Sequence, residues 1–317
     1  RSEKHMMMLR CGGAFAKSSR NRRKKPMKCS LCPRRCNAER TENENLNGIC
    51  KMPLQPVAAR AALHFWEEPC ISGQKGSGTV FFTGCNLDCA FCQNYEVSHL
   101  KKGKPITYER LADIFRELEA KGAHNINLVS PSHYVGAIIR ALDIYKPKIP
   151  VVYNSGGYDT PENIRALKDY ADIFLMDLKY LSPDRAKKYS GAENYPEYAV
   201  SAVKQAYLQQ PECVFKNGIM QKGVIVRHLL LPLGTREAIA VFDWVRENTP
   251  GAYFSIMSQY TPCGRAEQYP EINRRVTKRE YEKVLTYICN TDFRNVYIQE
   301  RNSSDEKYIP PFDLAGV

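Results

Sequence analysis

Three cysteines lie close together in the stretch TGCNLDCAFCQN, residues 83–94. Cys85, Cys89 and Cys92 have the spacing C-x3-C-x2-C, which allows one loop to present three thiolates to a single centre. Zinc and iron–sulfur clusters both prefer thiolate ligands. A structural zinc site is closed by four ligands, whereas an open coordination position indicates chemistry. Three cysteines around a [4Fe–4S] cube leave one iron free to bind another molecule, so the triad predicts a reactive cluster.

Two alternative interpretations of the triad are a zinc knuckle and three cysteines that only pack in the core. The position of the triad argues against both. It directly follows TVFFT, residues 79–83, a short apolar run that is typical of a buried strand. We therefore expect the three thiolates at the end of a strand, where an α/β fold places its chemistry.

A second group of cysteines precedes this strand, with the spacing C-x2-C-x3-C-x13-C. Its members are Cys29, Cys32, Cys36 and Cys50. Four thiols form a complete ligand set, in a segment too small for a core of its own. Structural zinc and an auxiliary [4Fe–4S] cluster both fit this spacing. The remaining cysteines lack partner spacing and are interpreted as packing residues; they are Cys11, Cys70, Cys213, Cys263 and Cys289. Of these, Cys70 is the one expected near the site.

Short apolar strands alternate with amphipathic helices from residue 78 onward. The predicted strands span 79–83, 125–130, 150–155, 173–179, 224–232 and 253–260, with a seventh at 296–300. Helix starts are indicated by Thr107, by the pairs Thr160–Pro161 and Ser182–Pro183, and by the capping box of Thr277 and Glu280. Such tandem units predict an α/β fold with a parallel sheet. Because no glycine-rich nucleotide fingerprint follows the first strand, we expect a full or partial (β/α)6 TIM-type barrel with a small Cys-rich N-terminal module.

Polar residues gather at the ends of the predicted strands, where barrels carry their active sites. They are Ser130, Ser132, His133, Asn154, Ser155, Asp177, Lys179, Arg227, His228 and Gln259. The sequence therefore predicts that these side chains meet the cysteine loop.

The cysteine loop on such a barrel resembles that of radical S-adenosylmethionine (SAM) enzymes. Further segments resemble the PflX-like branch of the pyruvate formate-lyase activating enzyme family, from about Cys29 to the C-terminus. They are GCNLDCAFCQN, NLVSPSHY, SGGY, DLKYLSPDRAKKYSGAENYPEYA, IVRHLLLP and MSQYTP. The resemblance divides the chain into a basic flexible tail (1–28), a Cys-rich metal-binding module with a lead-in (29–77), and a radical SAM barrel with a C-terminal extension (78–317).

The resemblance implies that SAM chelates the fourth iron of a cluster bound by Cys85, Cys89 and Cys92. An electron from the cluster then cleaves SAM, and the resulting 5′-deoxyadenosyl radical abstracts hydrogen from a substrate. Phe91 occupies the position of the aromatic residue that shields the cluster in this family.

The resemblance also implies roles for the strand-end residues. Asp177 and Lys179 match the DxK pair of glycyl-radical activases, and Arg227 matches a basic residue that contacts SAM. Lys179 and Arg227 are the catalytic candidates. The cofactor-binding candidates are Ser130, Ser132, Asn154, Ser155, Asp177, Arg227 and Gln259. An alternative for Lys179 and Arg227 is an ion pair with Asp177 inside the barrel, and His133 and His228 suit a buried structural role as well as a catalytic one.

The charge of the chain is concentrated at one end. The net charge is +12, but residues 1–28 hold ten Lys or Arg and one acid, whereas the other 289 residues hold 36 basic and 33 acidic side chains. We interpret the tail as a solvated extension; nucleic-acid binding, anionic membrane and an organellar transit peptide are the alternatives. The body therefore offers no extended phosphate-binding surface, and nucleic acid is not an expected partner.

The sequence predicts a cytoplasmic enzyme, because twelve cysteines occur without a secretion signal or a membrane-length apolar run. We expect flavodoxin or ferredoxin as electron donor. The expected substrate is a glycyl-radical enzyme to be activated, and the alternative is a small metabolite or a peptide. A non-catalytic iron–sulfur electron-transfer protein is the hypothesis from another class. RNA modification is a further hypothesis, and only the basic tail supports it.

Overall fold

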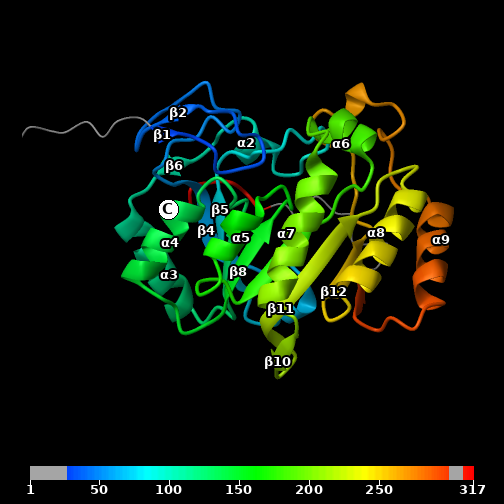
Figure 1. The fold of residues 1–317 in the computed structure, drawn as a ribbon. Helices are drawn as coiled ribbons and strands as arrows, with labels where there is room; N and C mark the ends of the chain where they lie inside the picture. Colours follow the sequence, from blue (N-terminus) through cyan, green and yellow to red (C-terminus); the bar gives the residue numbers. More distant parts are fainter. Residues whose placement is uncertain (1–26, 300–309) are drawn as a thin grey trace, which may run out of the picture.

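The computed structural model describes residues 27–299 and 310–317, so the predicted basic tail lies almost wholly outside the described residues. A mostly parallel sheet organises the fold (Figure 1). Its parallel strands are β5 (Ser77–Phe82), β7 (Ile126–Val129), β8 (Val151–Ser155), β9 (Ile173–Asp177), β11 (Ile219–Leu229), β12 (Tyr253–Met257) and β13 (Val296–Ile298). Its antiparallel strands are β4 (Val57–His64), β6 (Lys104–Pro105) and β10 (Val214–Lys216).

The strand order is β13-β12-β11-β9-β8-β7-β5-β4-β6, with β10 paired to β11, and the sheet does not close within the described residues. The fold is thus a partial TIM-type barrel, which confirms the predicted fold class. All seven predicted strands are present. Most are one to three residues shorter than predicted, because their polar carboxyl ends belong to the loops.

Helices cover one side of the sheet, in front of it in Figure 1. They are α3 (Tyr108–Ala120), α4 (Val135–Ile144), α5 (Pro161–Ala166), α7 (Tyr195–Gln209), α8 (Thr235–Asn248) and α9 (Lys278–Cys289). The predicted helix starts at Thr107 and Thr160 are confirmed, since each side chain accepts a hydrogen bond from the third helical residue. The capping box of Thr277 and Glu280 is also present.

Shorter helices lie in the connections between strands. They are α1 (Pro69–Ser72), α2 (Tyr95–Ser98), α6 (Pro183–Ser190) and a 3-10 turn at Ala266–Gln268. Ser182 caps α6 as predicted, and Gly191 ends it in the left-handed conformation. None of the helices in the described ranges is long and apolar enough to cross a membrane.

Strand β4 was not predicted from the sequence. It runs antiparallel to β5, with Ala61 opposite Val80, and extends the sheet beyond the first β–α unit. The predicted boundary between residues 77 and 78 would therefore separate β4 from its hydrogen-bonded neighbour β5. The C-terminal residues lie along β4, where the backbone N–H of Ala61 donates to the carbonyl of Ala315 over 2.8 Å.

The N-terminal module forms a small antiparallel sheet of β1 (Met27–Lys28), β2 (Glu39–Arg40) and β3 (Asn45–Leu46). Figure 1 shows its first two strands above the barrel, beside α2 and β6. The connection from β5 to α2 contains the cysteine triad, so the module lies at the end of the barrel that carries the predicted chemistry.

Candidate active site

A cavity of about 230 Å³ opens at the carboxyl ends of the strands. The structure brings all the predicted barrel site residues to this cavity. They are Cys85, Cys89, Cys92, Ser130, Ser132, Asn154, Ser155, Asp177, Lys179, Arg227 and Gln259. Carboxyl ends of parallel strands share one edge of a sheet, which explains how residues from six strands meet here.

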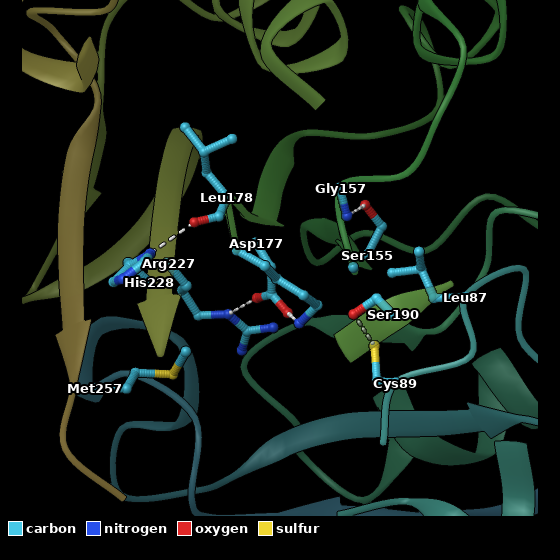
Figure 2. Close-up of polar contacts among 12 residues, drawn as sticks. Leu87, Cys89, Ser155, Gly157, Asp177, Leu178, Ser190, Arg227, His228 and Met257 are labelled. Atoms are coloured by element: carbon cyan, nitrogen blue, oxygen red, sulfur yellow. Dashed lines mark hydrogen bonds and ion pairs between the residues drawn. The ribbon is translucent and has the colours of Figure 1, made fainter. Parts of the chain in front are cut away.

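The cysteine loop is fixed against the end of α6. The backbone N–H of Asp88 donates to the carbonyl of Ser190 over 3.2 Å, and that of Ala90 donates to the carbonyl of Tyr189 over 2.8 Å. Figure 2 shows the Cys89 sulfur pointing toward the Ser190 hydroxyl, 3.1 Å away. These three contacts fix the loop through its backbone and through the Cys89 sulfur.

The three thiols are suited to a metal cluster. Burial raises the pKa of Cys85 and Cys89, and it raises the pKa of Cys92 to about 12. The thiols therefore stay protonated until a metal replaces their protons. Phe91 lies between the second and third cysteines, is buried, and packs edge-on against Tyr260 at 5.8 Å, so it excludes water from this side of the cavity.

The donor set of the loop fits a [4Fe–4S] cluster. Thiolates are the usual ligands of iron–sulfur clusters in proteins. Cys85, Cys89 and Cys92 would bind three irons of the cube and leave the fourth open to another molecule.

Asp177, at the end of β9, connects the two predicted catalytic residues. One of its oxygens accepts from Arg227 Nε over 2.9 Å (Figure 2). The other oxygen pairs with Lys179 Nζ over 2.5 Å. Lys179 is also an electrostatic neighbour of all three cysteines of the loop. Lys179 therefore places a positive charge close to the cysteine loop.

These three charges stabilise one another. Burial raises the pKa of the Asp177 carboxyl, but Lys179 and Arg227 outweigh it and keep the pKa below its usual value. Burial lowers the pKa of Lys179, but the charge and the hydrogen bond of Asp177 oppose this effect, and the pKa of Lys179 is raised. All three groups are therefore charged at neutral pH.

Glu67 is a site residue that sequence reasoning missed. It lies between β4 and α1, lines the cavity, and pairs with Arg227 over 2.9 Å. Its other oxygen accepts from the amides of Asn127 and Asn154 over 3.1 Å and 3.0 Å. Arg227 also donates to the side-chain oxygen of Asn154 over 2.6 Å. No local pattern marks Glu67, because β4 was not predicted and its partner is 160 positions away.

The loop after β7 has an unusual backbone. Ser130 has a positive φ of 59°, which costs a non-glycine residue free energy and is found mostly where the surroundings require it. The same loop buries Ser132, which lines the cavity. This conformation turns the predicted SPSH segment toward the cavity.

The two predicted histidines are buried structural groups. Burial lowers the pKa of His133 to about 3 and that of His228 to about 4. His133 bonds the carbonyl of Thr83 over 2.8 Å, and His228 bonds that of Leu178 over 2.8 Å. Both rings are therefore neutral near pH 7. Of these two histidines, His133 lines the cavity and His228 does not.

The four N-terminal cysteines also come together. Cys29 and Cys32 are buried, and Cys36 and Cys50 are half-buried. Burial raises the pKa of Cys32 to about 11, and the three other thiols contribute to the same rise. We call Cys29, Cys32, Cys36 and Cys50 the N-terminal thiol set.

The remaining described cysteines differ from one another. Cys70 is buried in a core cluster with Ile173 and Ile225, which confirms its predicted packing role. It does not line the cavity, so its expected approach to the site was wrong. Cys289 is exposed at the end of α9, and its predicted packing role was also wrong.

Comparisons with known proteins identify the superfamily of this chain. The family model of the radical SAM superfamily matches residues 79–223. An uncharacterised protein of Methanocaldococcus jannaschii, MJ0674, is 31% identical over 267 residues, which are 81% of this chain and 73% of that protein. The chain belongs to the radical SAM superfamily. Membership implies a radical-generating enzyme, and the family uses a [4Fe–4S] cluster and SAM.

The fold is shared with a solved structure. The SAM-bound structure of SuiB from Streptococcus suis aligns with 69% of this chain at 14% identity and a TM-score of 0.50. The chain spans about half, 48%, of that structure. A domain of pyruvate-formate lyase-activating enzyme from Bacteroides vulgatus aligns with 61% of this chain and 91% of its own length, at 10% identity and a TM-score of 0.31.

Proposed function

We propose that this enzyme reductively cleaves SAM at a [4Fe–4S] cluster bound by Cys85, Cys89 and Cys92, and that it directs the resulting radical to a substrate hydrogen. The observation that carries the proposal is that the three thiols and the linked charges of Asp177, Lys179 and Arg227 line one cavity. The cluster and SAM supply the electron transfer and the radical chemistry. The chain supplies binding, orientation and the exclusion of water.

The charged residues are assigned to cofactor binding. Arg227 presents a guanidinium to the cavity and is suited to a carboxylate such as that of SAM. Asp177 fixes this guanidinium through its Nε atom. Asn154, Ser155, Ser130, Ser132 and Gln259 offer neutral polar atoms around it. Lys179, beside the cysteine loop, is assigned to orienting the reacting groups.

The substrate class is inferred from the motifs. DLKYLSPDRAKKYSGAENYPEYA and MSQYTP favour the PflX-like branch and hence activation of a glycyl-radical enzyme. A peptide or small metabolite is the second candidate. It is favoured by Trp66, which lines the cavity yet is 52% exposed, and by its neighbour Phe65, which is 48% exposed. Exposed aromatic side chains at a cavity mouth are suited to contacting a substrate.

We assign the N-terminal thiol set to a second metal centre, either structural zinc or an auxiliary iron–sulfur cluster. We also retain three regions as a proposal: the tail 1–28, the Cys-rich module with its lead-in 29–77, and the barrel 78–317. Flavodoxin or ferredoxin is the proposed electron donor, and the cytoplasm is the proposed compartment.

Anaerobic reconstitution tests the proposed activity. The wild-type protein is expected to bind about four irons at the barrel site, to give a cluster signal in electron paramagnetic resonance that SAM changes, and to form 5′-deoxyadenosine with dithionite. The Cys85→Ala/Cys89→Ala/Cys92→Ala variant is expected to lose all three properties. Cys289→Ala, which removes an exposed thiol outside the cavity, is the matched control. A reduced, intact cluster whose spectrum does not change when SAM is added would contradict the proposal.

A further inference from the structure

Arg40 is a fully buried arginine in the N-terminal module, with 1% of its surface exposed. It lies on β2, and its Nη1 atom is 3.6 Å from the Cys29 sulfur. Both terminal nitrogens donate to the carbonyl of His133, over 3.2 Å and 3.1 Å, and one also donates to the carbonyl of Pro53. The buried Nε atom has no hydrogen-bond partner among the described residues.

The charge of Arg40 has no carboxylate partner in the part of the chain that the structure describes. The nearby Glu42 accepts from Tyr108 and pairs with Arg140 instead. Backbone carbonyls are dipoles and only partly compensate a buried cation. Removing an unpaired charge from water is costly, so a buried charge is usually paired.

The missing negative charge is available from the N-terminal thiol set. Cys29 contacts the guanidinium directly, and the positive charge of Arg40 acts on Cys50. Neutral thiols do not balance a cation. Four thiolates on a divalent metal ion or on an iron–sulfur cube carry a net negative charge, because the metal replaces their protons.

We propose that Arg40 is the counter-ion of an anionic, thiolate-bound metal centre formed by the N-terminal thiol set. This inference rests on the proposed second metal centre and is independent of SAM cleavage in the barrel. Arg40 contacts a sulfur on one side and the carbonyl of His133 on the other, and His133 lines the cavity. The occupied centre therefore fixes Arg40 and, through it, the loop after β7.

The test uses the Cys85→Ala/Cys89→Ala/Cys92→Ala protein as the parent, so that only the N-terminal centre contributes metal. Arg40→Gln removes the charge and keeps a hydrogen-bond donor, and Arg40→Lys keeps the charge. Arg140→Gln is the control, because Arg140 pairs with Glu42 of the same module and contacts no cysteine. Metal and sulfide are quantified in each protein during titration with a chelator.

We expect Arg40→Gln to release its metal at about 10–100-fold lower chelator concentration than the parent, as is typical when a partner of a metal ligand is lost. Arg40→Lys and Arg140→Gln are expected to release it within about threefold of the parent. Unchanged release in Arg40→Gln would overturn the proposal. Release from Arg40→Lys as early as from Arg40→Gln would also overturn it, since the charge would then have no effect. If Arg40→Gln does not fold, the Lys variant decides alone: release within about threefold of the parent supports the proposal, and release at about tenfold lower chelator concentration or less overturns it.

The identity of the metal gives a second readout. If the centre contains iron and sulfide, Arg40→Gln is expected to lower its reduction potential, because the reduced form carries more negative charge. An iron centre whose potential is unchanged or higher would overturn the counter-ion role. If the centre contains zinc instead of iron, the chelator titration alone tests the proposal.

The origin of the metal is checked by removing the four N-terminal thiols from the parent. Metal that remains bound would overturn both the second centre and the role of Arg40. SAM cleavage is measured separately in protein with an intact barrel triad, so that failure of the second centre and failure of the proposed enzyme activity are distinguishable.

Discussion

The Nε atom of Arg34 donates a hydrogen bond of 2.8 Å to the carbonyl oxygen of Asn86. Arg34 lies between Cys32 and Cys36, and Asn86 directly follows Cys85. Arg34 also donates to the carbonyls of Ser190 and Gly191, and its guanidinium lies 5.3 Å from the centre of the Tyr158 ring. One arginine thus joins the N-terminal module to the cysteine loop of the barrel.

Replacing Arg34 by Ala is expected to loosen the cysteine loop. Losing a hydrogen bond from a charged donor costs about 1.5–3 kcal/mol. We expect the barrel cluster of Arg34→Ala to be lost to a chelator about tenfold faster than that of wild type, followed by its visible absorption. Arg35→Ala is the control, because the structure places Arg35 over the Tyr198 ring at 6.0 Å, away from the loop. Equal loss rates in both variants would contradict a specific role of Arg34.

Replacing Arg227 by Ala is expected to weaken SAM binding by about one to two decades, the cost of one charge-assisted contact to a carboxylate. It also leaves the buried carboxylate of Glu67 without its cation, whereas Asp177 keeps Lys179, so we expect a loss of stability of about 3–5 kcal/mol. Calorimetric SAM titration well below the melting temperature separates the two effects.

Glu67→Gln is the companion variant for Arg227, because it removes the charge of Glu67 but keeps one accepting oxygen and the shape of the side chain. It is expected to retain most of the SAM affinity. Normal affinity in Arg227→Ala together with a lowered melting temperature would assign Arg227 to structure alone.

Replacing Lys179 by Ala distinguishes orientation of the reacting groups from ion pairing. If Lys179 orients substrate, 5′-deoxyadenosine formation survives while substrate turnover falls by about 10²-fold or more, the typical effect of misplaced groups. Chromatographic assay of both products measures the ratio. Iron content is expected to stay normal, because Lys179 is not a cysteine ligand. A variant that instead reproduces the SAM-binding defect of Asp177→Ala would limit Lys179 to its ion pair.

Stability is expected to fall as the pH drops below 6.5. His133 and His228 have folded-state pKa values lowered to about 3 and about 4, below the unfolded value of 6.5. Between these values the unfolded chain binds protons that the folded protein excludes. Each histidine then costs about 2 kcal/mol at pH 5 relative to pH 8. Urea unfolding at several pH values measures this slope, and His228→Asn is expected to remove about half of it. An unchanged slope would mean that His228 protonates in the folded protein.

Replacing Gly157 by Ala is expected to disturb the position of Asp177. Gly157 has a φ of +79°, and a Cβ atom there would lie 2.0 Å from the carbonyl oxygen of Asp177. We expect a loss of stability above about 2 kcal/mol, from the left-handed backbone and the clash together, with weaker SAM binding. Gly136→Ala in α4, where a Cβ meets nothing within 4 Å, is the control and is expected to stabilise by about 0.5–1 kcal/mol. Thermal melts of both variants test the contrast.

The sequence by itself determined the parallel strands of the barrel, most of its helix starts and the type of cofactor. The apolar runs predicted the parallel strands, and local signals such as Thr107 and the Thr277–Glu280 box marked the helix starts. The triad of Cys85, Cys89 and Cys92 indicated the cluster because one loop contains all its ligands. Strand-end residues such as Asp177 were predictable for a similar reason: the carboxyl ends of parallel strands share one edge of a sheet.

Only the tertiary structure decided which charges meet across the chain. Glu67 pairs with Arg227 from a strand connection that has no local signature. Arg34 and Arg40 have no local signature either, and only folding places one on the cysteine loop and buries the other beside Cys29. The physical reason is that periodicity and capping are properties of neighbouring residues, whereas ion pairs and buried charges depend on contacts between distant segments.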